Sequence, residues 1–148
     1  MKKFILSVVL SFISFVSVSQ IVEVTFNEHL SFTTPINSDD YFTIISQDSI
    51  TLDKKRLGNN KYVINLDKKI VSLFFQGSFI KKTTINKVDY KDGFIILTIN
   101  DIDMISGQPM FVYLVINQHS DKNDYPYFTF YFESDGITNG YLVLEKTI

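Results

Sequence analysis

The chain of 148 residues contains no cysteine. This absence excludes disulfides, a thiol nucleophile and thiolate metal sites. It also excludes a lipoprotein, because no cysteine follows the apolar start of the chain that could carry the lipid. Stability must therefore come from apolar burial, and a chain of this length buries roughly two thirds of its unfolded surface.

Arginine is almost missing, since Arg56 is the only one, and Lys54, Lys55 and Arg56 form the only basic cluster. Without the first 19 residues the chain has 12 basic and 16 acidic residues, a formal charge of −4. Recognition of nucleic acid depends on clustered lysine and arginine. We therefore expect no nucleic-acid partner.

Alanine is absent as well, whereas Ile, Val, Phe, Tyr and Thr are abundant. Alanine is the best helix former, and the abundant residue types are those that fit a pleated sheet. The composition therefore favours an all-β fold.

The first 19 residues are typical of an export signal. Lys2 and Lys3 precede an apolar run from Phe4 to Val16, and small residues follow at the spacing of a cleavage site. A retained membrane anchor is the alternative, but a spanning helix needs ~20 apolar residues, and this run is shorter and interrupted by serines.

We therefore predict cleavage between Ser19 and Gln20, which leaves residues 20–148 as a single domain. The mature protein is expected in the periplasm or outside the cell, without stable insertion into a membrane.

Short apolar runs separated by turn residues recur along this domain, and no window sustains a helical repeat. The turn signals include Gly58-Asn59-Asn60, Asp67-Lys68-Lys69 and Asp92-Gly93. The predicted strands are Ile21–Phe26, Tyr41–Ser46, Ser49–Leu52, Lys61–Leu66, Ile70–Phe75, Thr83–Tyr90, Phe94–Ile99, Met110–Asn117, Tyr127–Glu133 and Tyr141–Lys146.

The short connections predict an antiparallel up-and-down meander that closes into a small barrel of about eight strands. A two-sheet β-sandwich is the alternative, because the connections Asn27–Asp40, Asn100–Pro109 and Gln118–Pro126 are longer. The strands Phe94–Ile99 and Met110–Ile116 are apolar on both faces, so they need cover from a second layer or another subunit.

The last hairpin supplies the candidate binding residues. Keeping its phenylalanines and leucines together on the core face implies a loop of about five residues between the two strands. The predicted core face holds Phe128, Phe130, Phe132, Leu142 and Leu144, and the opposite face holds Tyr127, Tyr131 and Tyr141. Because tyrosine joins a large apolar ring to a polar tip, we predict these three tyrosines as ligand-binding residues. The alternative is that they are only good strand formers.

Candidate catalytic and metal sites are weak. Glu133 and Glu145 share the tyrosine face but lie too far apart for the carboxylate pair of a glycosidase. The acidic loops at Asp101–Asp103 and Asp121–Asp124 lack the EF-hand pattern, and the two histidines, His29 and His119, lack a zinc-binding spacing. No glycine loop for phosphate is present. We predict no catalytic residue, no metal and no cofactor.

The leading functional hypothesis is a small exported binding protein rather than an enzyme. A barrel would hold an apolar small molecule, and a sandwich would offer its tyrosine face to a glycan, another polymer or a protein. A secreted hydrolase is one alternative, and a structural or assembly component is the other. The sequence indicates no particular ligand and no oligomeric state.

Overall fold

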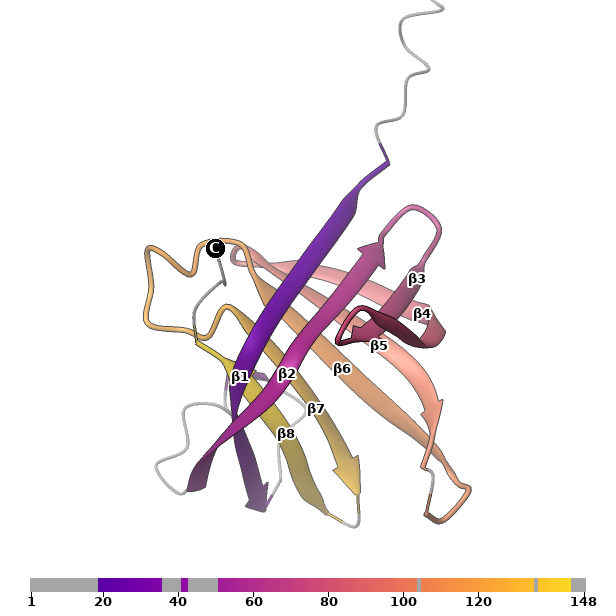
Figure 1. The fold of residues 1–148 in the computed structure, drawn as a ribbon, viewed down its shortest axis with the longest axis vertical. Helices are drawn as coiled ribbons and strands as arrows, with labels where there is room; N and C mark the ends of the chain where they lie inside the picture. Colours follow the sequence, from indigo (N-terminus) through magenta and orange to yellow (C-terminus); the bar gives the residue numbers. More distant parts are fainter. Residues whose placement is uncertain (1–18, 36–40, 43–50, 104, 135, 145–148) are drawn as a thin grey trace, which may run out of the picture.

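The computed structural model describes residues 19–35, 41–42, 51–103, 105–134 and 136–144. They form a closed barrel in which each strand is antiparallel to its neighbours and strands adjacent in sequence are adjacent in space (Figure 1). The strands are β1 (Ile21–Pro35), β2 (Thr51–Asn65), β3 (Ile70–Phe75), β4 (Ser78–Lys91), β5 (Phe94–Ile102), β6 (Pro109–Asn117), β7 (Phe128–Ser134) and β8 (Ile137–Val143). The predicted up-and-down barrel is confirmed, and the two-sheet alternative is wrong.

Tight turns of two residues join several of the strands. Gln76 and Gly77 connect β3 to β4 with φ angles of 48° and 80°, and Asp92 and Gly93 connect β4 to β5 with 50° and 84°. Two successive positive φ angles define the hairpin turn whose twist matches that of the strands it joins. The turn predicted at Asp92-Gly93 is confirmed.

The barrel closes where β1 pairs with β8, from Leu30 opposite Leu142 to Pro35 opposite Ile137. This closure makes β1 longer than predicted, because the segment after Phe26 continues as a strand instead of a connection. The pairing of β1 with β2 shifts register between Phe26 and Glu28. Such a bulge changes which side chains face inward.

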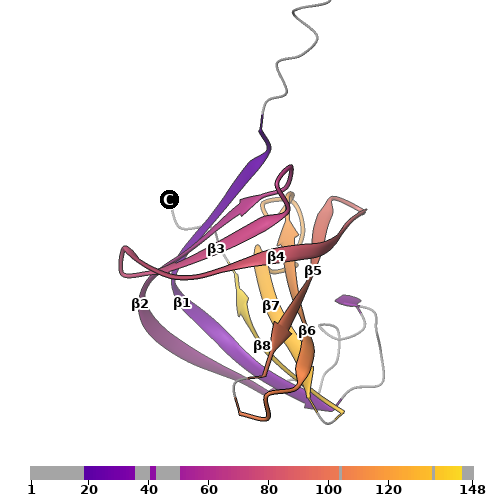
Figure 2. The ribbon, with the colours of Figure 1, turned by 90° about the vertical axis from the view of Figure 1, so that its right-hand side faces the viewer.

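The predicted strand Tyr41–Ser46 is wrong at its start, where Tyr41 and Phe42 lie in a helical turn. Residues 43–46 lie outside the described part of the chain. This turn lies outside the barrel (Figure 2). The Tyr41 ring stacks on that of Tyr131, with centroids 6.1 Å apart.

Apolar side chains form two layers. The inner layer fills the barrel and includes Val24, Phe26, Tyr62, Ile64, Leu97, Leu114 and Phe128. The outer layer contains Phe32, Tyr41, Phe94, Val115, Tyr131 and Leu142. Strands β5 and β6 are therefore apolar on both faces, as predicted, and the turn at Tyr41 and Phe42 supplies cover for the outer one.

Strand β4 changes partner along its length. Residues 78–84 pair with β3, whereas residues from Ile85 onward pair with β5. The first half of β4 therefore crosses away from the end of β5 together with β3, as Figure 2 shows. The first half of β4 and the end of β5 are therefore not paired with each other, and we call this unpaired boundary the seam. Two residues of the cavity described next, Lys81 and Asp101, lie on its two sides.

Candidate functional site: a cavity inside the barrel

The inside of the barrel holds a cavity of about 340 Å³ that is open to solvent on one side. Its size is within the ~300–1,000 Å³ range of small-molecule sites in proteins. All eight strands contribute to its lining. The apolar lining residues are Phe26, Val71, Leu73, Ile99, Val112, Leu114 and Phe130, and the polar or amphipathic ones are His29, Asn60, Tyr62, Lys81, Thr83, Asp101 and Tyr141.

Two tyrosines from strands far apart in sequence meet in this lining. The hydroxyl groups of Tyr62 on β2 and Tyr141 on β8 form a hydrogen bond of 2.5 Å. The Tyr141 ring also stacks on Phe130, with centroids 4.9 Å apart. Burial raises the pKa of Tyr62 to about 12, although its hydrogen bond to Tyr141 acts the other way. Burial also raises the pKa of Tyr141 well above its usual value. Both side chains are therefore neutral phenols at ordinary pH.

His29 lies beside this pair, with its ring centroid 4.5 Å from that of Tyr141. Burial lowers the pKa of His29, and the nearby positive charge of Lys55 lowers it further. Its Nε2 atom is 3.2 Å from the Ser31 hydroxyl, whereas its buried Nδ1 atom has no partner among the described residues. The imidazole is therefore neutral at pH 7.

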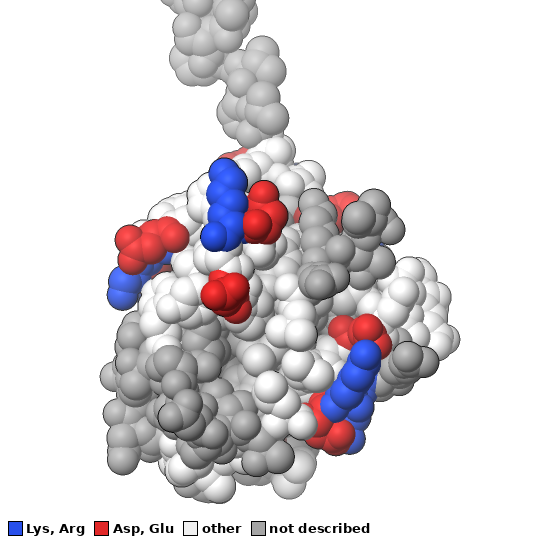
Figure 3. All heavy atoms as spheres, turned by 90° about the vertical axis from the view of Figure 1, so that its left-hand side faces the viewer, with Lys and Arg blue, Asp and Glu red and all other residues white. Residues whose placement is uncertain are grey.

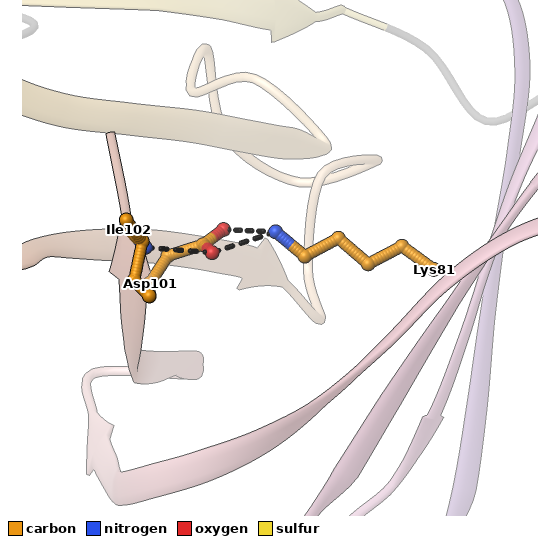
Figure 4. A network of polar contacts seen from close by, with 3 residues as sticks. All are labelled: Lys81, Asp101 and Ile102. Atoms are coloured by element: carbon orange, nitrogen blue, oxygen red, sulfur yellow. Dashed lines mark hydrogen bonds and ion pairs between the residues drawn. The ribbon is translucent and has the colours of Figure 1, made fainter. Parts of the chain in front are cut away.

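Lys81 and Asp101 carry the charge in the cavity lining. The Lys81 ammonium lies 2.5 and 2.6 Å from the two Asp101 carboxylate oxygens (Figure 4). Their side chains are 45% and 24% exposed, so the pair stands where the cavity meets solvent. Asp101 also accepts a hydrogen bond from the Ile102 amide. Because Lys81 is on the first half of β4 and Asp101 is at the end of β5, this ion pair bridges the seam.

The three predicted tyrosines do not share a face, so the premise of the tyrosine site is wrong. Strands β7 and β8 are joined by only two residues, and Ser134 pairs with Ile137. This register places Tyr141 opposite Phe130, inside the barrel, and Leu142 opposite Thr129, on the outer face. The predicted loop of five residues and the predicted face of Leu142 are therefore both wrong.

Each of the three tyrosines has a different environment. Tyr141 lines the cavity, and Tyr127 lies in the inner layer, where its hydroxyl donates to the Glu23 carbonyl at 3.4 Å. Burial raises the pKa of Tyr127. Tyr131 is only 5% exposed and stacks between Tyr41 and Tyr113 in the outer layer. Of the three, only Tyr141 contributes to the cavity.

The acidic loops and His119, considered above as possible metal ligands, do not form a metal site in the described part of the chain. Asp103 accepts hydrogen bonds from the Ile105 amide and the Ser106 hydroxyl, and these bonds lower its pKa. His119 is exposed, as expected for a loop histidine. In the described part of the chain, no three His, Asp or Glu residues lie close enough together to hold a metal ion.

Several of the surface charges are paired. On the face shown in Figure 3, lysine and acidic side chains lie beside one another. Ion pairs of 3.0 Å between Lys54 and Glu28, and of 2.9 Å between Lys61 and Glu23, join β1 and β2. Among the described residues, no helix is long and apolar enough to cross a membrane.

By its fold and its cavity, the chain is a small antiparallel β-barrel with an internal cavity. Comparison with protein-family models, with curated proteins and with solved structures finds no match to this chain.

Proposed function

We propose that this protein is an exported, non-catalytic binding protein that holds a small and largely apolar molecule inside its barrel. The cavity of about 340 Å³ is the observation that carries the proposal. With Tyr62 and Tyr141 included, nine of its fourteen lining residues are aliphatic or carry a benzene ring, and the other five are polar. A lining of this kind is typical of sites that bind small molecules by burial and orient them by a few hydrogen bonds.

The polar lining gives less support to a hydrolase. His29 and Ser31 are within hydrogen-bonding distance, which is the beginning of a nucleophile and base pair. In such sites a third group orients the imidazole through its other nitrogen. No described residue forms a hydrogen bond with Nδ1 of His29.

Two other hypotheses also lose support. A polymer or protein bound on a tyrosine face requires Tyr127, Tyr131 and Tyr141 to be accessible together, and Tyr131 is buried in the outer layer. A structural component was suggested by strands that are apolar on both faces, and the turn at Tyr41 and Phe42 supplies cover for them within the same chain.

Binding is tested with a neutral fluorescent probe, N-phenylnaphthylamine, whose emission rises when it enters an apolar site. We expect saturable binding to the purified protein. Val112→Phe should weaken it, because Val112 lines the cavity and the larger ring takes up part of the space. Val63→Phe is the matched control, since Val63 lies between the inward-facing Tyr62 and Ile64 on β2 and outside the cavity lining.

Thermal unfolding of both variants shows whether each is folded. Weaker probe binding by a folded Val112→Phe protein, with unchanged binding by Val63→Phe, supports the proposal. Equal binding by the two variants, or none by the unsubstituted protein, would contradict it.

Export is supported by the charged and apolar start of the chain, from Met1 to Ser19. N-terminal sequencing of protein recovered outside the cytoplasm should begin at Gln20. An intact Met1 on membrane-bound material would contradict cleavage.

A further inference from the structure

The Tyr62–Tyr141 pair holds one hydrogen-bond donor that the protein does not use. Each phenol has one O–H donor, and in their mutual hydrogen bond one hydroxyl donates and the other accepts. Neither hydroxyl makes another hydrogen bond with the described residues. One proton of the pair is therefore left over, and both rings line the cavity.

We infer that the ligand of this cavity has an apolar body and one uncharged hydrogen-bond acceptor, such as a carbonyl, which accepts a hydrogen bond from the O–H group that Tyr62 and Tyr141 do not use between themselves. This inference rests on the proposed binding function and specifies the class of molecule bound.

The need for an acceptor follows from the cost of an unused donor. An apolar molecule that fills the cavity removes the hydroxyl from water, and a buried donor without a partner is unfavourable. A ligand that carries a carbonyl at this position satisfies the donor and avoids that cost. The pair should therefore discriminate between molecules of the same shape that differ only in an acceptor.

The acceptor should be uncharged because the wall around it is uncharged. Tyr62, Tyr141 and His29 are all neutral at pH 7, by the burial described above. The cation in the lining, Lys81, already pairs with Asp101 where the cavity meets solvent. A carboxylate among the aromatic side chains would lose its hydration without gaining a free cation.

The test uses three naphthalenes that share one body and differ in a single substituent: ethyl, acetyl or carboxylate. Each competes with N-phenylnaphthylamine for the purified protein, and the dissociation constants are compared. Acetylnaphthalene should bind about tenfold more tightly than ethylnaphthalene, which corresponds to one net hydrogen bond. Naphthoate should bind more weakly than acetylnaphthalene.

The variants identify the donor. Either tyrosine alone still has a proton to donate, so both hydroxyls are removed together in the double variant Tyr62→Phe and Tyr141→Phe. Ethylnaphthalene should bind this variant at least as tightly as the unsubstituted protein, because no donor is left without a partner, and the preference for the acetyl compound should fall to one or below. Tyr127→Phe is the matched control, because it removes a phenol of the inner layer that does not line the cavity.

The outcomes separate the inference from the proposed function. If ethyl- and acetylnaphthalene bind the unsubstituted protein equally, or if naphthoate binds best, the inference is wrong and the binding function stands. A preference that persists in the double variant overturns the role of the tyrosine pair. If neither the probe nor any naphthalene binds, the proposed function fails as well.

Discussion

Buried tyrosines should make this fold sensitive to alkali. Burial raises the pKa of Tyr41 to about 12 and that of Tyr62 to about 12, whereas tyrosine in an unfolded chain titrates near ~10. A group whose pKa is higher in the folded state contributes stability below its unfolded pKa. That contribution is lost as the pH rises from about 10 toward 12, because only the unfolded chain can then release the protons freely.

The size of the effect follows from the two shifts. With shifts of about two pKa units each, Tyr41 and Tyr62 together should cost roughly 5 kcal/mol of unfolding free energy by pH 12. Since a domain is stable by only ~5–15 kcal/mol, much of the stability should disappear in this window. Tyr141, whose pKa is raised as well, adds to the loss in the same direction.

Urea unfolding between pH 9 and pH 12, followed by circular dichroism, measures this loss. Phenol ionisation can be followed directly by ultraviolet absorbance, because the chain has eight tyrosines and no tryptophan. The double variant Tyr41→Phe and Tyr62→Phe should show a much weaker dependence on pH. Tyr90→Phe, at a position 61% exposed, is the control. A double variant that loses stability as steeply as the unsubstituted protein would refute the reasoning.

Two further substitutions test the packing. Tyr131→Ala should cost ~3–5 kcal/mol of unfolding free energy, the range for truncating a buried aromatic ring, because its side chain is only 5% exposed. Phe111→Ala, at a position 55% exposed, should cost far less unfolding free energy. Urea unfolding measures both costs, and equal costs would contradict the described outer layer. Gly140→Ala should destabilise by about 3 kcal/mol, because the added Cβ would meet the Phe130 carbonyl oxygen and the Phe32 ring. An unchanged melting temperature for this variant would show that β7 and β8 can separate without cost.

The barrel could be predicted from sequence because its signals are local. Strand β3 has the predicted bounds, Ile70 to Phe75, since an apolar run is closed on one side by Asp67-Lys68-Lys69 and on the other by Gln76-Gly77. Tight turns between short strands leave few arrangements other than a meander. The fold class therefore follows from features within a few residues of one another.

The register of the last hairpin was mispredicted because two local signals conflict. The prediction grouped all phenylalanines and leucines on one face, whereas the two-residue connection pairs Ser134 with Ile137. A shift of one residue turns every side chain to the opposite face. Leu142 can face outward because it belongs to the outer apolar layer. The sequence predicts such a layer only over the strands Phe94–Ile99 and Met110–Ile116, not over the last hairpin.

The site was not predictable because no local pattern encodes it. Tyr62 and Tyr141 are 79 residues apart in sequence and meet only when the barrel closes. His29 joins the lining because the bulge after Phe26 shifts the alternation of β1 by one residue. The ion pair of Lys81 and Asp101 requires β4 to leave β5, which the turn signals do not predict.

Because β4 changes partner along its length, backbone amides in different parts of the barrel should exchange with solvent at different rates. Residues 78–84 have ladder hydrogen bonds to β3 only, and the bridge to β5 is a partly exposed ion pair worth at most ~1 kcal/mol. Strand β6, by contrast, is bonded to β5 on one side and to β7 on the other around Leu114. Amide protons in the first half of β4 should therefore exchange with solvent through local fluctuations, whereas those around Leu114 exchange only when the whole barrel unfolds.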